Sequence, residues 1–148
     1  MQPLDNNFFE EYKRLDRICS DMYSSRNGVS QYISDMESKS RRGEYAVPNW
    51  RLVYRDLVHL RHLRIQIAHE SGDYPFCTEE DIETLRELSH KILTQQDPLS
   101  LLYQYEIKLY QNEQKRSAGR LLSNGTTIPP RKRKLSGRRP QLPVEQFS

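Results

Sequence analysis

Cysteine is scarce in this sequence of 148 residues, which contains only Cys19 and Cys77. Two cysteines are too few for a disulfide framework, and neither has neighbours at the spacing of metal ligands. Long apolar runs are missing as well, since none approaches the roughly 20 residues that cross a bilayer. The N-terminus lacks the basic and apolar segments of a signal peptide. We therefore expect a protein of the reducing cytoplasm with no membrane partner.

The net charge of +3 is unevenly distributed along the chain. Residues 120–148 contain seven basic residues and one acidic residue, whereas acidic residues outnumber basic ones in residues 1–119. The C-terminal segment also has few residues that could build a core, and it contains several prolines. Such composition is typical of disorder. The sequence therefore predicts a helical domain over 1–119 and a disordered basic tail over 120–148.

Apolar residues recur at helical spacing in five segments of the first 119 residues, and no alternating strand pattern is visible. Between the second and third of these segments lies a polar connector, residues 38–49, which contains Gly43 and Pro48. The predicted fold is all-α, a single five-helix bundle. Its helices are expected at about 7–23, 29–38, 50–68, 78–93 and 98–117.

Short polar residues mark several of the expected helix starts. Asp5, Asn6 or Asn7 can cap the first helix, because a side-chain oxygen at this position accepts a free N–H of the first turn. Thr78, followed three residues later by an acidic residue, is close to a capping box. Asp97-Pro98 combines a capping carboxylate with proline at the first helical position. These signals support the predicted order of the elements.

The expected helix at 50–68 is the most apolar and should lie at the centre of the bundle. Its predicted inner face includes Val53, Leu57 and Leu60, with Arg64 on the same face. Arg64 and His69, five residues apart near the end of this helix, form the one constellation in the sequence that suggests chemistry. The full motif reads Arg64-Ile65-Gln66-Ile67-Ala68-His69.

This motif resembles the signature of the HEPN superfamily (higher eukaryotes and prokaryotes nucleotide-binding domains), whose members are small helical bundles. The resemblance implies a metal-independent ribonuclease or an RNA-binding protein, with two motifs meeting across a homodimer cleft built on the helix at 50–68. His69 would act as general acid and base, and Arg64 would hold the scissile phosphate. The order of the helices is also similar to that of short uncharacterised bacterial proteins.

The position after the arginine is commonly Asn, Asp or His in catalytic members, and here it is Ile65. Five residues of an ideal helix also turn Arg64 and His69 about 140° apart, so the two converge only if the helix unwinds near Ala68 or a partner chain contributes. An Ile65 packed in the core would favour a binding module. Exposure of Arg64 and His69 together in a basic concavity would favour the nuclease.

The alternative is a non-enzymatic helical interaction module. Arg64 would then be a structural arginine paired to Glu10, Asp16 or Glu87, and His69 would complement the negative end of its helix. The basic tail would bind nucleic acid or an acidic partner, because a flexible polycation gains affinity for phosphates by counterion release. The expected nucleic-acid-binding residues are Arg131, Lys132, Arg133, Lys134, Arg138 and Arg139.

Three histidines, His59, His62 and His69, lie in the expected third helix and could be considered as metal ligands. No carboxylate or cysteine completes a compact ligand set with them unless Glu70 or Asp56 turns in. The sequence therefore predicts no metal ion and no cofactor. RNA or another nucleic acid is the expected partner.

Overall fold

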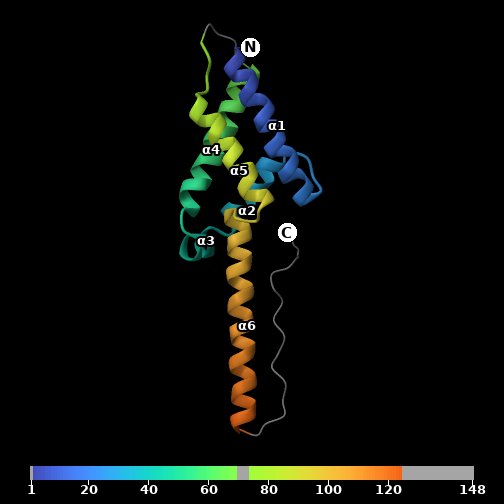
Figure 1. Ribbon diagram of the computed structural model, residues 1–148, viewed down its shortest axis with the longest axis vertical. Coiled ribbons are helices and arrows are strands. Elements are labelled where there is room, and N and C mark those ends of the chain that lie inside the picture. The colour runs from blue at the N-terminus through green and yellow to red at the C-terminus, as the bar shows by residue number, and fades with distance from the viewer. Residues whose placement is uncertain (1, 70–73, 125–148) are drawn as a thin grey trace.

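The structure is a computed structural model that describes residues 2–69 and 74–124, with side chains through residue 119. Helices make up almost all of these residues, and no strand occurs within them. The all-α fold class is therefore confirmed. Figure 1 shows a bundle from which one long helix projects. The helices are α1 (Pro3–Tyr23), α2 (Gly28–Ser38), α3 (Ser40–Ala46), α4 (Trp50–His69), α5 (Glu79–Leu93) and α6 (Pro98–Asn124).

All five expected helices are present, and the short helix α3 is an addition to them. It lies within the segment 38–49 that was expected to be a connector. Gly43 lets this short helix lie close to Trp50, because a Cβ at position 43 would lie only 2.3 Å from the Trp50 ring. The missing side chain lets α3 sit directly on the buried indole, and burial of that large apolar surface stabilises the helix.

The core is formed mainly by α1, α2, α4 and α5, with α1 packed against both α2 and α5. The faces predicted from helical spacing are buried with few exceptions. On α1 the exception is Met22, which follows the buried Cys19 by three residues but is 36% exposed. No helix in the described ranges combines the length and apolar composition that a membrane span requires. The fully buried side chains include Phe8, Leu15, Cys19, Val29, Tyr32, Ile33, Met36, Leu57, Leu60 and Leu85.

Asp5 has a different role from the expected helix cap. The helix α1 starts at Pro3, so Asp5 lies within its first turn, and the residue before the helix makes no side-chain capping bond. The buried carboxylate of Asp5 instead accepts the backbone N–H of Phe76 at 2.9 Å and of Cys77 at 3.2 Å. Asp5 therefore ties the segment before α5 to the start of α1.

The capping box at the start of α5 is confirmed. Thr78 Oγ1 accepts the backbone N–H of Asp81 at 3.2 Å, and the Asp81 carboxylate accepts the backbone N–H of Thr78 at 2.9 Å. These reciprocal bonds satisfy two N–H groups that a helix start leaves without partners.

At the start of α6, Asp97 is only 1% exposed. Its carboxylate accepts the hydroxyl of Tyr32 and the backbone N–H of Ser100. The Tyr32 oxygen in turn accepts the N–H of Leu99 at 3.1 Å. Burial raises the pKa of Asp97 above its usual value, although its hydrogen bonds act in the opposite direction. This buried polar cluster fixes the base of α6 to α2.

Beyond its base, α6 leaves the bundle, as Figure 1 shows. Leu99 and Leu102 are buried, whereas Leu109, seven residues after Leu102 and so on nearly the same side of the helix, is 50% exposed. The helix packs against α3, where Arg42 and Glu106 form an ion pair at 2.9 Å. It also continues to Asn124, so residues 120–124 of the expected tail are helical. The rest of that tail, 125–148, lies outside the described residues.

Candidate functional site

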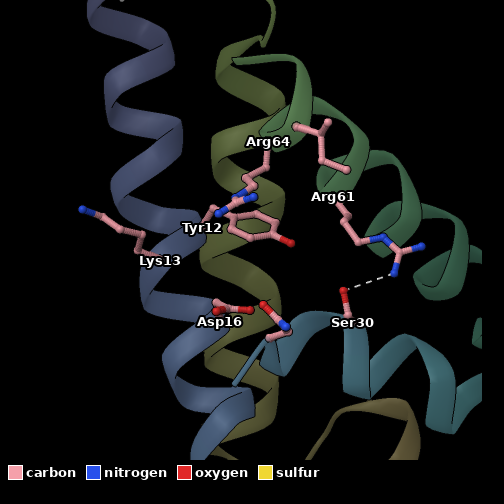
Figure 2. Close-up of a pocket in the computed structure, with 8 residues that line it drawn as sticks. Tyr12, Lys13, Asp16, Ser30, Arg61 and Arg64 are labelled. Carbon is pink, nitrogen blue, oxygen red and sulfur yellow. Dashed lines mark hydrogen bonds between the residues drawn. The ribbon is translucent and has the colours of Figure 1, made fainter. Parts of the chain in front are cut away.

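Arg64 lies on the solvent-exposed surface of α4, where it lines a hollow of about 130 Å³. This hollow, which we call the α1–α4 pocket, is enclosed by α1, the turn before α2, α2 itself and α4, as Figure 2 shows. Arg64 is therefore not part of the apolar face on which helical spacing had placed it. The pocket is lined by Tyr12, Lys13, Asp16, Asn27, Ser30, Arg61, Arg64 and Ile65.

One wall of the pocket depends on a close approach between α1 and the start of α2. Asn27 has a left-handed backbone with φ of 57°, and a Cβ on Gly28 would lie 2.2 Å from the backbone nitrogen of Ser20. Only glycine fits this contact without displacing backbone. The N–H of Gly28 then donates to Ser20 Oγ at 3.1 Å, and that of Val29 donates to Asp16 Oδ1 at 2.9 Å.

The opposite wall carries two arginines of α4. Arg61 and Arg64 are three residues apart, so both project from the same side of the helix. Arg61 Nη1 donates to Ser30 Oγ at 3.3 Å, and the guanidinium carbon of Arg64 lies 5.8 Å from the centre of the Phe9 ring. A guanidinium has five N–H donors, so these contacts orient both groups and leave donors for a ligand.

Lys13 lines the pocket, but its positive charge is largely directed elsewhere. Its ammonium group pairs with Glu10 at 3.2 Å, and Figure 2 shows the side chain pointing away from Arg61 and Arg64. The charged groups that face the pocket are therefore the two guanidinium groups and the carboxylate of Asp16. The net charge of these three groups is positive, so the pocket favours an anionic ligand.

Tyr12 lies between the two walls, but it is no acid or base at neutral pH. Its burial, followed by the charge of Asp16, raises the pKa of the phenol well above its usual value. The phenol therefore stays neutral, and its ring forms part of the floor of the pocket beside Arg64 (Figure 2).

His69 does not line the pocket that contains Arg64. The helix α4 continues without interruption through His69, so the local unwinding that would bring the two side chains together is not present. Both are exposed, and about 140° of helix rotation separates them. Ile65, which is 45% exposed, lies at the edge of the pocket and not in the core. The six basic residues predicted to bind nucleic acid, from Arg131 to Arg139, lie outside the described residues.

A second hollow, of about 350 Å³, lies between α2, α3 and the first turns of α4. Its charges are largely matched within the protein. Arg51 pairs with Glu44 at 2.8 Å, and the hydroxyl of Tyr54 donates to Glu37 at 2.6 Å. This hollow therefore attracts an anion less than the α1–α4 pocket does.

Metal-binding groups do not converge in the part of the chain that the structure describes. Among residues 2–69 and 74–124, no three side chains of His, Cys, Asp or Glu are placed to hold a metal ion. His59 instead lies beside Asp81, with 3.2 Å between Nε2 and Oδ1.

Sequence reasoning identified Arg64 and named Asp16 among three candidate partners for it, but it missed Arg61 and Ser30. Arg61 could have been found from its spacing of three residues to Arg64. Ser30 is far from Arg64 in the sequence, so no local signal connects the two.

Fold and site together define a small all-helical protein with a cationic pocket between its helices. The chain matches a family described as a family of unknown function (DUF6548) over residues 6–134, and it belongs to that family. No curated protein and no solved structure matches the chain. This match is consistent with the expected likeness to an uncharacterised family, while the HEPN resemblance stays a prediction.

Proposed function

We propose that this protein is a helical RNA-binding module that holds a phosphate group of RNA in the α1–α4 pocket. The observation that carries the proposal is the pair of oriented guanidinium groups, Arg61 and Arg64, on one wall of a recessed pocket. Guanidinium groups match phosphate oxygens in charge and in geometry, and they stay charged at all physiological pH values.

The size of the pocket supports a single phosphate as the bound group. The hollow has a volume of about 130 Å³. That space suits the five heavy atoms of a phosphate group. The flanking nucleotides would then lie outside the pocket, where the exposed Ile65 and the ring of Phe9 offer apolar contact surface.

Binding accounts for this geometry better than cleavage does. General acid–base catalysis of RNA cleavage needs a group that titrates near neutral pH beside the phosphate. The pocket lining contains no histidine, and its tyrosine stays protonated. A HEPN-like ribonuclease remains the second candidate. In that case His69 from a second copy of the chain would complete the site, because His69 is exposed at the end of α4.

The basic residues of the tail are proposed to add affinity without adding sequence preference. Arg131, Lys132, Arg133 and Lys134 form a continuous run. Contacts of this kind release counterions from the RNA, so their contribution falls as salt rises. Substitution of the four residues by glutamine should lower affinity and reduce the slope of log K against log salt.

The proposal is tested by fluorescence anisotropy with a labelled single-stranded RNA and the full chain in EDTA. The double variant Arg61→Gln, Arg64→Gln should bind at least about tenfold more weakly, because hydrogen bonds to charged groups contribute about 1.5–3 kcal/mol each. The matched control is Arg51→Gln, Arg55→Gln, which removes the same charge from the same helix at the second hollow.

Equal losses in the two double variants, or no loss in the first, would show that the pocket does not bind RNA. The length of the RNA is followed by gel electrophoresis in the same samples. Intact RNA agrees with a binding module. Cutting that both Arg64→Gln and His69→Ala abolish would favour the nuclease instead.

A further inference from the structure

A carboxylate in the wall of an anion-binding pocket calls for an explanation. Asp16 lies on α1, across from Arg61 and Arg64 on α4, as Figure 2 shows. It is half-buried, and one of its oxygens accepts the N–H of Val29 at 2.9 Å. A ligand consisting of phosphate alone would be attracted by the arginines and repelled by Asp16, since like charges in a confined site disfavour one another.

The carboxylate has capacity for a second partner. An ionised carboxylate accepts hydrogen bonds at about four lone-pair positions and donates none. The hydrogen bond from Val29 occupies one of these positions. A ligand that carries a hydroxyl group beside its phosphate would place the phosphate on Arg61 and Arg64 and donate the hydroxyl proton to Asp16. With such a ligand, the hydrogen bond from the hydroxyl to Asp16 offsets the repulsion between the phosphate and the carboxylate.

RNA has this arrangement along its whole backbone, because each ribose carries a 2′-hydroxyl next to a phosphodiester, and DNA lacks that hydroxyl. We propose that Asp16 is the residue by which this pocket selects RNA over DNA, accepting a hydrogen bond from the 2′-hydroxyl next to the phosphate that Arg61 and Arg64 hold. This inference rests on the proposed RNA-binding function and adds its basis of selectivity.

The neighbouring polar groups are consistent with this assignment. Ser30 Oγ accepts a hydrogen bond from Arg61 Nη1 and keeps its own O–H to donate to a phosphate oxygen. The amide of Asn27, at the edge of the pocket, can donate as well as accept. Asp16 is the one acceptor-only group in the lining, which is the property that a hydroxyl donor requires. A site built to bind a hydroxyl discriminates strongly against the analogue that lacks it.

The test compares dissociation constants of the full chain for three oligonucleotides of one sequence: RNA, DNA and 2′-O-methyl RNA. The wild-type protein should bind RNA about tenfold more tightly than either of the others, as expected for one hydrogen bond to a charged acceptor. The 2′-O-methyl RNA keeps the ribose oxygen but cannot donate, so it isolates the proton of the 2′-hydroxyl and needs no protein variant.

The variant Asp16→Asn keeps an oxygen that can accept the N–H of Val29, and it removes the negative charge. Affinity for DNA should rise, and the ratio of RNA to DNA affinity should fall towards one. The matched control is Asp21→Asn, which makes the same charge change at an exposed position on α1 outside the pocket. It should strengthen binding of both nucleic acids equally and leave the ratio unchanged.

Two failures are distinguishable. If the wild-type protein binds RNA and DNA equally, or if Asp16→Asn retains the wild-type ratio, the role of Asp16 is overturned while RNA binding stands. If the wild-type protein binds no RNA, the proposed function and this inference fall together. A thermal melt followed by circular dichroism establishes that each variant is folded.

Discussion

The four-helix core and the projecting helix α6 are built from similar residues but held in place by different forces. In α1, α2, α4 and α5 the apolar residues follow the helical repeat, and their side chains are buried. In α6 several apolar residues occur at every second position, and a helix turns about 200° over two residues. One side of the helix therefore carries Tyr103 and Ile107, and the opposite side carries Tyr105 and Leu109. No single face of α6 can therefore bury them all.

Polar contacts hold α6 in addition to the apolar packing of its first turns, where Leu99 and Leu102 are buried. The hydrogen bond of Tyr32 to the buried Asp97 fixes the start of α6, and the ion pair of Arg42 and Glu106 joins its third turn to α3. The core helices and α6 all contain many apolar residues, but only the core helices are largely buried. The number of apolar residues therefore does not predict how much of a helix is buried. Apolar residues recur at helical spacing in α6 as well, but other apolar residues lie on its opposite side, so α6 has no face as distinctly apolar as those of the core helices.

The sharpest test of this difference is one leucine from each region. Leu85 is fully buried in α5, so Leu85→Ala should lower the free energy of unfolding by about 2–5 kcal/mol through lost burial and a residual cavity. Leu109→Ala, in the exposed part of α6, should change it by less than about 0.5 kcal/mol. Urea unfolding followed by circular dichroism measures both. A large loss for Leu109→Ala would mean that α6 is packed against a partner.

Two glycines provide the next test. Gly28→Ala places a Cβ against the backbone of Ser20 and Asp16, so it should cost about 1–3 kcal/mol of stability and disturb the wall of the α1–α4 pocket. Gly119→Ala is the matched control, because a Cβ there has no atom within 4 Å. It should be neutral or stabilise α6 by up to about 1 kcal/mol. Equal effects of the two changes would refute the close approach of α1 and α2.

The polar cluster at the base of α6 is tested by removing the hydroxyl group of Tyr32. Tyr32→Phe leaves the Asp97 carboxylate and the N–H of Leu99 without their shared partner inside the protein. Stability should fall by about 1–2 kcal/mol, the cost of leaving buried polar groups unsatisfied. Tyr103→Phe, at an exposed position on α6, should have almost no effect in the same urea titration.

The smallest effect is expected in the pH dependence of stability. Since the pKa of Asp97 is raised on folding, the folded state binds this proton more tightly than the unfolded state does. The stabilising contribution of the protonated carboxyl is complete below the unfolded pKa near 3.9 and is lost as pH rises through the folded pKa.

Asp97→Asn removes this titration. As the pH is raised from 3 to 7, the wild-type protein should lose the stabilising contribution of the protonated Asp97, and the variant should not. The free energy of unfolding of the variant should therefore rise relative to that of the wild type over this range. Parallel curves for the two proteins over that range would contradict the raised pKa of Asp97.

Most of the fold could be predicted from the sequence because local signals determine it. Helical spacing identified the core helices, and Thr78 with Asp81 marked the start of α5 correctly. The helix α3 was missed because Gly43 and Pro48 in the polar segment 38–49 indicated a connector, whereas the close approach of Gly43 to Trp50 depends on packing that no local pattern reveals. The departure of α6 from the bundle was missed because Leu102, Tyr105 and Leu109 do recur at helical spacing, and spacing alone does not say how far along a helix its neighbours extend.

The candidate site was less predictable than the fold. Arg64 was identified through its motif, but its expected partner His69 points to another side of α4. The groups that do meet Arg64 come from α1 and from the turn before α2, brought there by the close approach at Gly28. Contacts between distant segments of the sequence depend on how the helices pack, which the periodicity of each helix alone does not specify.

Under the proposed RNA-binding function, the length of α6 bears on how much RNA the protein would contact. Its 27 residues span about 40 Å. The run of basic residues follows α6 in the sequence, so a long RNA that reached both the α1–α4 pocket and this run would gain affinity from the raised effective concentration of the second contact, whereas a short RNA would engage only one of them.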